Sequence, residues 1–300
     1  RRLANGRGQF TDRLSDSCGP FWPAFAEIFL EFAKLHALVN FIVRICASTK
    51  LRLMSVEKSV KEIRATGLLV VFAALCTALS AGIITAVAGS PKPNPGSAFQ
   101  NAIVEFELVV NSQEVQAVLS QPSEELARAR RTQFNYLNYA DYLFMICYSA
   151  LNATIFLFVA ALNRSRFRER FVGNAFIRFG LLLSFLMLAG DALENVQLLR
   201  LTSMPEPEMS STIKALIIFT RIKWGALFTA AILLGLAYAS YSGRTGLLFV
   251  GFLYATAGSI GIMSLIVLSG RPLCEWGTLL LAVAWLVSAV HAGVRTFRRA

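Results

Sequence analysis

Six long apolar segments constrain this 300-residue chain more than any other feature of its sequence. Each is long enough to cross about 30 Å of hydrocarbon as a helix, which takes ~20 residues at ~1.5 Å per residue. The sequence therefore predicts an all-α fold, a polytopic membrane helical bundle of about six transmembrane helices. The predicted spans lie near 67–89, 140–162, 176–199, 213–239, 246–268 and 274–293.

The composition excludes several other classes of protein. Hydrophobic residues make up 55% of the chain and charged residues 16%, which is incompatible with a disordered or collagen-like chain. A water-soluble globule is disfavoured because the apolar residues form long runs instead of an amphipathic period. In a membrane protein the net charge of +11 indicates orientation. We therefore predict membrane lipids as partners and no nucleic acid.

The basic residues predict how the chain is oriented, because cytoplasmic connections of membrane proteins are enriched in Lys and Arg. The 163–175 connection contains Arg164, Arg166, Arg168 and Arg170, whereas the 200–212 connection has one cation, at its edge. The C-terminus is also basic. We expect both termini to be cytoplasmic, in a protein integral to the bacterial cytoplasmic membrane.

The chain divides into a membrane domain, 54–300, and a preceding segment, 1–53. No methionine occurs before Met54, so 1–53 is either a native cytoplasmic segment or sequence upstream of a start at Met54. Within it, residues 22–48 are apolar but carry too many charges to span a membrane, and would suit an interfacial helix.

The segment 90–139 is predicted to form an extracytoplasmic cap. Three prolines and a glycine open it as a loop, and apolar positions then recur at helical spacing on both sides of a short break. These features predict a short helical hairpin after the first span. The hairpin would be either a solvated connection or a lid over a site.

Small residues predict where spans approach one another, since close helix packing in lipid needs short side chains. The first span has Ala74, Ala78, Gly82 and Ala86 at a spacing of four, and the fifth has a series of glycines and alanines from Gly251 to Gly261. We expect both stripes to pack tightly against neighbouring helices.

Ionisable residues inside the predicted spans mark a candidate site, because each costs ~2.5–3.5 kcal/mol to insert. Asp191, Glu194 and Asn195 follow one another at helical spacing, so they share one face of the third span. Asp191 lies about 12 Å from the outer end of that span. The second span carries Asp141 and, seven residues on, Tyr148 on nearly the same stripe.

The fourth span supplies the bases. Arg221 and Lys223 are two residues apart and point to nearly opposite helix faces. Arg221 can extend its guanidinium to lipid headgroups, so we predict that Lys223 faces the acids. Three acids against one base leave surplus negative charge. Either one carboxyl is protonated, or the site binds a proton or cation. Alternatively, buried ion pairs of this kind only lock helices together.

The order of these residues resembles that of a group of uncharacterised bacterial polytopic membrane proteins. The shared pattern is an EL dipeptide after the first span, Asp and Tyr in the second, DxxEN in the third and Lys in the fourth. Here it corresponds to Glu107-Leu108, Asp141 with Tyr148, Asp191 through Asn195, and Lys223. The resemblance implies that Lys223, not Arg221, belongs to the pattern, and that Glu107 joins the mouth of the site.

Other chemistry has little support in the sequence. His36 and His291 have no carboxylate or Cys at metal-ligand spacing, and the five cysteines include no CxxC. No P-loop or nucleophile-elbow motif occurs. We therefore predict no metal and no cofactor.

Three classes of function fit this pattern. A small-solute or proton-coupled carrier would use the polar pocket as an ion or proton site, and this is our leading interpretation. A lipid-modifying or isomerising membrane enzyme would use a buried carboxylate as acid and base, with a lipid in the outer half of the bundle. A scaffold or accessory protein would need the cluster only for packing.

Overall fold

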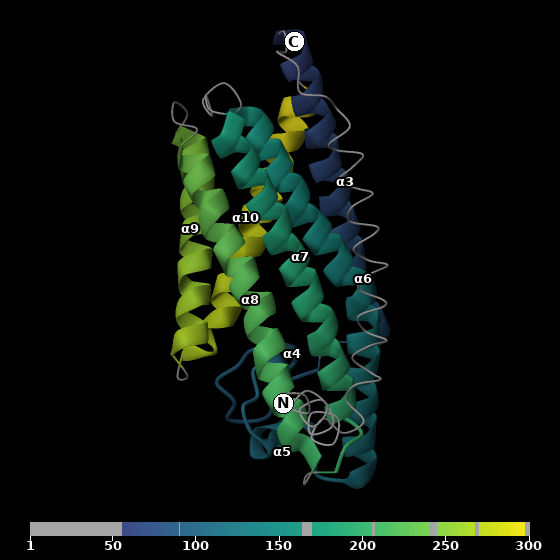
Figure 1. Ribbon diagram of the computed structural model, residues 1–300. Coiled ribbons are helices and arrows are strands. Elements are labelled where there is room, and N and C mark those ends of the chain that lie inside the picture. The colour runs from purple at the N-terminus through teal and green to yellow at the C-terminus, as the bar shows by residue number, and fades with distance from the viewer. Residues whose placement is uncertain are drawn as a thin grey trace, which may run out of the picture. The chain divides into compact units, whose positions relative to one another are not determined.

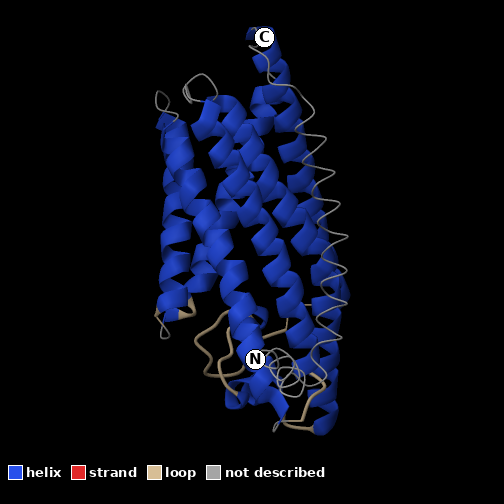
Figure 2. Cartoon of the chain, viewed as in Figure 1, coloured by secondary structure: helices blue, strands red, loops and turns tan. Residues whose placement is uncertain are grey.

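The computed structural model describes residues 56–89, 91–163, 170–205, 208–240, 245–267 and 270–297. The predicted segment 1–53 and Met54 lie outside this part of the chain. The described helices, shown in Figures 1 and 2, are α3 (Val56–Ala88), α4 (Ala102–Glu107), α5 (Ser112–Leu119), α6 (Glu124–Asn163), α7 (Arg170–Leu201), α8 (Met209–Ser240), α9 (Thr245–Ile266) and α10 (Leu273–Phe297).

Six of these helices are long and apolar enough to cross a membrane: α3, α6, α7, α8, α9 and α10. Large apolar side chains such as Phe72, Leu79, Phe252 and Leu286 stand on their outer faces, more than half exposed. Such a surface is unfavourable in water and favourable against lipid tails. The prediction of an all-α membrane bundle with six spans is confirmed, and the chain is an integral membrane protein.

The long helices pack in the order in which they occur along the chain. Each one lies against the next, from α3 through α6, α7, α8 and α9 to α10, and α10 closes the arrangement by packing on α3. The connections between described helices therefore alternate between the two ends of the bundle. One end carries α4 and α5, at the bottom of Figure 1, and we call it the cap end.

The second span is longer than the sequence suggests. Helix α6 has 40 residues, about 60 Å at the helical rise and roughly twice the hydrocarbon thickness. Helix begins at Glu124, directly after the bend at Pro122, so the last part of the predicted cap segment, 124–139, is continuous with the second span. The first turns of α6 bury Ala127, Phe134 and Leu137 while the rest of the helix crosses the bundle.

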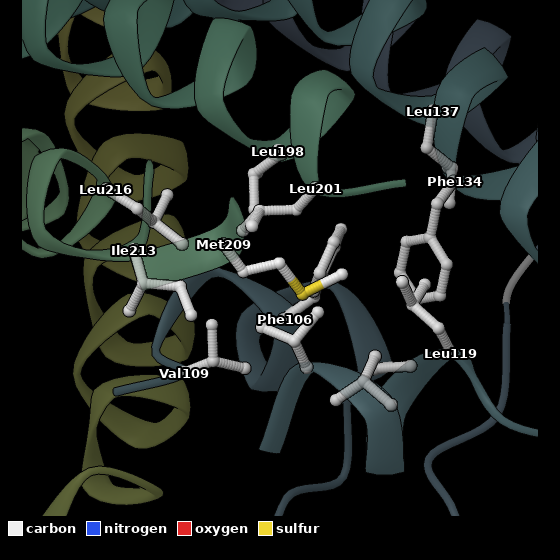
Figure 3. Close-up of a cluster of buried hydrophobic side chains, with 13 residues drawn as sticks. Phe106, Val109, Leu119, Phe134, Leu137, Leu198, Leu201, Met209, Ile213 and Leu216 are labelled. Atoms are coloured by element: carbon white, nitrogen blue, oxygen red, sulfur yellow. The ribbon is translucent and has the colours of Figure 1, made fainter. Parts of the chain in front are cut away.

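The cap has a hydrophobic core of its own that is continuous with the bundle (Figure 3). Phe106 of α4 packs its ring against Phe134 of α6, with centroids 4.9 Å apart. The buried cluster joins side chains of the cap to the ends of α6, α7 and α8: Ala102, Phe106, Val109, Val115, Val118, Leu119, Phe134, Leu137, Leu198, Leu201, Met209, Ile213 and Leu216. The cap is thus packed onto the bundle.

Polar contacts fasten the cap to the connection between α9 and α10. The Glu275 carboxylate accepts hydrogen bonds from the backbone N–H groups of Gln100 and Asn101, at 2.7–3.0 Å. Arg271 donates to the Leu108 carbonyl oxygen and forms an ion pair with Glu114, 2.8 Å between Nη1 and Oε2. These contacts hold residues 100–114 in one position over the bundle.

The small residues of α9 pack against α8 as expected. A Cβ on Gly235 of α8 would lie 2.8 Å from the Gly251 carbonyl oxygen, and one on Gly258 would lie 2.6 Å from the Phe228 carbonyl oxygen. The corresponding prediction for α3 is wrong, because a Cβ on Gly82 would meet nothing within 4 Å. Helix α3 instead buries Val70, Ala73, Thr77 and Ser80.

We expect Gly235→Ala to destabilise the protein, because the added methyl group meets backbone atoms that cannot move independently. The expected cost is about 1–3 kcal/mol. Gly82→Ala is the matched control and should cause no loss, since its site is open and alanine favours a helix. Thermal unfolding of both variants in detergent measures the difference. Equal melting temperatures would contradict the close α8–α9 contact.

Candidate functional site

Lys223 lies at the centre of a buried cluster of charges. Its ammonium nitrogen is 2.8 Å from Asp191 Oδ1, 2.8 Å from Glu194 Oε2 and 3.0 Å from Glu107 Oε1. All four side chains are at least nine-tenths buried. We refer to Glu107, Asp191, Glu194 and Lys223 as the charged cluster. Three elements supply it, namely α4, α7 and α8.

Local sequence explains how these side chains meet. Asp191 and Glu194 are three residues apart on α7 and therefore project from one face. Gly190 lets α7 approach α8 at the same level, because a Cβ there would lie 2.7 Å from the Lys223 backbone nitrogen. Glu107 is the last residue of α4, where the cap meets the bundle. The close approach of α7 to α8 thus encloses the lysine on one side, and the cap encloses it on the other.

Neutral side chains complete the shell around the acids. The Tyr148 hydroxyl of α6 donates a hydrogen bond to Asp191 Oδ2. Thr220, one turn before Lys223 on α8, donates to Glu194 Oε1 at 2.7 Å and lies 3.2 Å from the Glu107 carbonyl oxygen. The Lys223 ammonium also lies 4.8 Å from the centre of the Trp224 ring, a cation–π distance.

The structure separates two predicted members from the cluster. Asp141 Oδ2 accepts a hydrogen bond of 2.8 Å from Asn195 Nδ2, so these two residues form a pair that links α6 to α7. Arg221 is exposed, and it lines the cavity that also borders Glu107. The acid that completes the set around Lys223 is Glu107, whereas the helical pattern alone had favoured Asp141.

The charges of the cluster do not balance. Three carboxylates surround one ammonium, so the formal charge is −2 if all are ionised. Burial penalises such a surplus heavily, and protonation of a carboxyl relieves it. Burial also raises the pKa of Glu107 above its ordinary value, against the opposing effect of the Lys223 ammonium. The arrangement therefore favours bound protons among the acids.

A small cavity of about 40 Å³ reaches the cluster from the cap. Its polar lining consists of Glu107, Thr220, Arg221, Ser264 and Arg271. This volume is enough for a few water molecules. Glu107 Oε2 is buried and has no hydrogen-bond partner in the described part of the chain. Glu107 is therefore the acid best placed to exchange a proton with water.

Two residues of the site, Thr220 and Arg271, were not predicted from the sequence. Thr220 could have been found, because it lies one turn from Lys223 on the same helix face. Arg271 is distant in sequence from Leu108 and Glu114, and the sequence contains no signal for that contact. In the structure Arg271 fixes the backbone directly after Glu107.

The described residues contain no group of three or more His, Cys, Asp or Glu side chains placed to hold a metal ion. Comparison with known proteins found no matching family model, no matching curated protein and no matching solved structure. Function must therefore be argued from the geometry of the cluster.

We expect Lys223→Met to destabilise the protein by about 3–5 kcal/mol, because it leaves three buried acids without their cation. Adding Glu194→Gln to this variant should recover part of the loss, since one fewer acid is left uncompensated. Thermal unfolding of the single and double variants in detergent measures both effects. A lysine that contributes only van der Waals packing would instead give a modest loss and no recovery.

Proposed function

We propose that this integral membrane protein is a proton-binding carrier, in which the charged cluster takes up and releases protons coupled to the passage of a small solute. The observation that carries the proposal is the excess of acids around Lys223. Helices can be locked together by one buried acid per base, and that arrangement is neutral. Three acids on one base serve packing poorly but create sites for protons.

The contacts within the cluster favour exchange of protons among its members. Lys223 touches all three acids at 2.8–3.0 Å, so a change of charge on one acid alters the interaction of the ammonium with the other two. Thr220 bridges Glu194 and the Glu107 backbone. The protons are therefore shared by a coupled group.

Access to the cluster is proposed to occur from the cap end. The cavity beside Glu107 provides a place for water, and the cap core and Arg271 hold that acid at its inner wall. Solute would enter from the same side, since the acids lie nearer to the cap than to the opposite end of α8.

The cap end is proposed to face away from the cytoplasm of a bacterial cell. In the sequence, an arginine-rich stretch follows Asn163, where α6 ends, and Arg295 lies in the last turn of α10. Both helices end opposite the cap, and the positive-inside rule assigns that end to the cytoplasm. Phosphatase and fluorescent-protein reporters test this orientation. A reporter fused after residue 300 should fluoresce and show no phosphatase activity, and one inserted near Pro95 should behave in the opposite way.

The central experiment compares wild type with Asp191→Asn in proteoliposomes. Infrared spectra recorded during a pH titration follow the C=O band of protonated carboxyl groups, and an enclosed pH dye follows proton flux under an imposed membrane potential. We expect a titrating band in wild type, and we expect Asp191→Asn to lower the proton flux at least tenfold. The variant should remain folded, because the amide keeps the shape of the side chain.

Glu125→Gln is the matched control, since it makes the same acid-to-amide change on an exposed part of α6. It should leave the flux unchanged. A wild-type protein with no titrating carboxyl band, together with an Asp191→Asn variant that is lost from the membrane, would assign the cluster to packing instead.

A further inference from the structure

Buried polar side chains continue from the charged cluster toward the end of the bundle opposite the cap. Asn152 lies one turn beyond Tyr148 on α6, and its Nδ2 donates a hydrogen bond of 2.9 Å to Ser184 Oγ on α7. Ser149 Oγ is buried beside them. The Tyr148 ring also stacks on Trp285 of α10, with centroids 6.1 Å apart. Polar groups from three helices thus meet directly beyond the Tyr148–Asp191 hydrogen bond.

Further from the cap, three hydroxyl groups from α8, α9 and α10 lie close together. Ser288 lies one turn beyond Trp285, and its Oγ accepts a hydrogen bond from the Tyr238 hydroxyl at 3.2 Å. The Tyr254 hydroxyl lies 3.0 Å from the same oxygen. The two tyrosine rings stack with centroids 5.8 Å apart. All three side chains are almost completely buried, so three hydroxyl groups share one point inside the bundle.

The series ends near the C-terminal end of α10. His291 lies one turn beyond Ser288, between the rings of Phe158 and Tyr238. Arg295, one turn further, donates from Nε to His291 Nε2 at 3.4 Å and is partly exposed. Tyr238 is fifteen residues beyond Lys223 on α8, about 22 Å along the helix. The polar groups therefore extend over most of the hydrocarbon thickness.

Ordinary helix packing does not account for this pattern. Where a hydroxyl is needed only to fill space, it bonds to a carbonyl of its own helix, as Thr77 of α3 does with Ala73 at 2.8 Å. Ser184 Oγ also donates to a carbonyl of its own helix, that of Gly180 at 2.9 Å, but in addition it accepts from Asn152 of α6. The Tyr238 and Tyr254 hydroxyls of α8 and α9 meet Ser288 of α10. Ser149 Oγ and Trp285 Nε1 are buried without a protein partner in the described part of the chain. Such atoms are normally satisfied by water.

We propose that these groups form a proton path between the charged cluster and the end of the bundle opposite the cap. We call the set the polar column: Ser149, Asn152, Ser184, Tyr238, Tyr254, Trp285, Ser288 and His291. At each step a hydroxyl, a bridging water or the His291 imidazole accepts a proton and releases its own proton to the next such group, so no group is altered by a full passage. Asn152 and Trp285 orient these groups by hydrogen bonding and carry no proton themselves. This inference rests on the proposed proton-binding function. It adds a second route by which protons enter or leave the charged cluster, at the end of the bundle opposite the cap.

The test measures proton flux in proteoliposomes under an imposed potential. Asn152→Leu places an apolar side chain in the part of the column nearest the charged cluster. Tyr254→Phe combined with Ser288→Ala removes two hydroxyls from the part nearer the end of the bundle opposite the cap. We expect each variant to lower the flux at least tenfold. Both should keep the titrating carboxyl band of wild type, because the charged cluster is untouched.

Thr77→Val is the control, since it removes a buried hydroxyl of a span outside the column and should leave flux unchanged. Tyr254→Phe alone keeps the ring stack and provides a variant whose folding is secure; it should lower flux to a smaller degree. The path would be overturned if both column variants conducted protons as wild type does, or if the wild-type protein showed the carboxyl band but conducted no protons. Either result would leave the proposed proton-binding site unaffected. Absence of the carboxyl band in wild type would overturn both.

Discussion

The ion-pair contacts of Lys223 organise the part of the molecule that carries chemistry. One ammonium joins the last residue of α4 to two acids of α7, and all of them are withdrawn from water. A buried lysine or a buried acid alone would be costly in this environment. Each therefore depends on the others, and the positions of the cap, α7 and α8 depend on the set.

Glu107 gives the cap a role beyond covering the bundle. Glu107 is part of the cap as the last residue of α4, and its carboxylate is part of the charged cluster. It also lines the cavity that reaches the cluster from the cap. The cap core in Figure 3 and the Arg271 contact with Leu108 hold the backbone on either side of this residue. The site is for this reason complete only when the cap is folded.

Helical periodicity was sufficient to predict much of the site. Asp191 and Glu194 had to share a face, and the spacing of Arg221 and Lys223 required that one of them point away from it. Helical periodicity did not predict which residue Asp141 contacts. A helical wheel gives the direction of a side chain but not its height relative to a side chain on another helix. Asp141 therefore pairs with Asn195, while Glu107 takes the place at Lys223.

The sequence by itself determined the membrane fold, the six spans and the placement of charges inside them, because hydropathy and helical period are local properties. The tertiary structure decided which charges touch, where the cap sits and that polar side chains of α6 through α10 line up inside the bundle. These outcomes depend on helix packing. Gly190 beside Lys223 and the glycines along α9 set the distances between helices, and the stripe on α3 that looked equivalent faces outward.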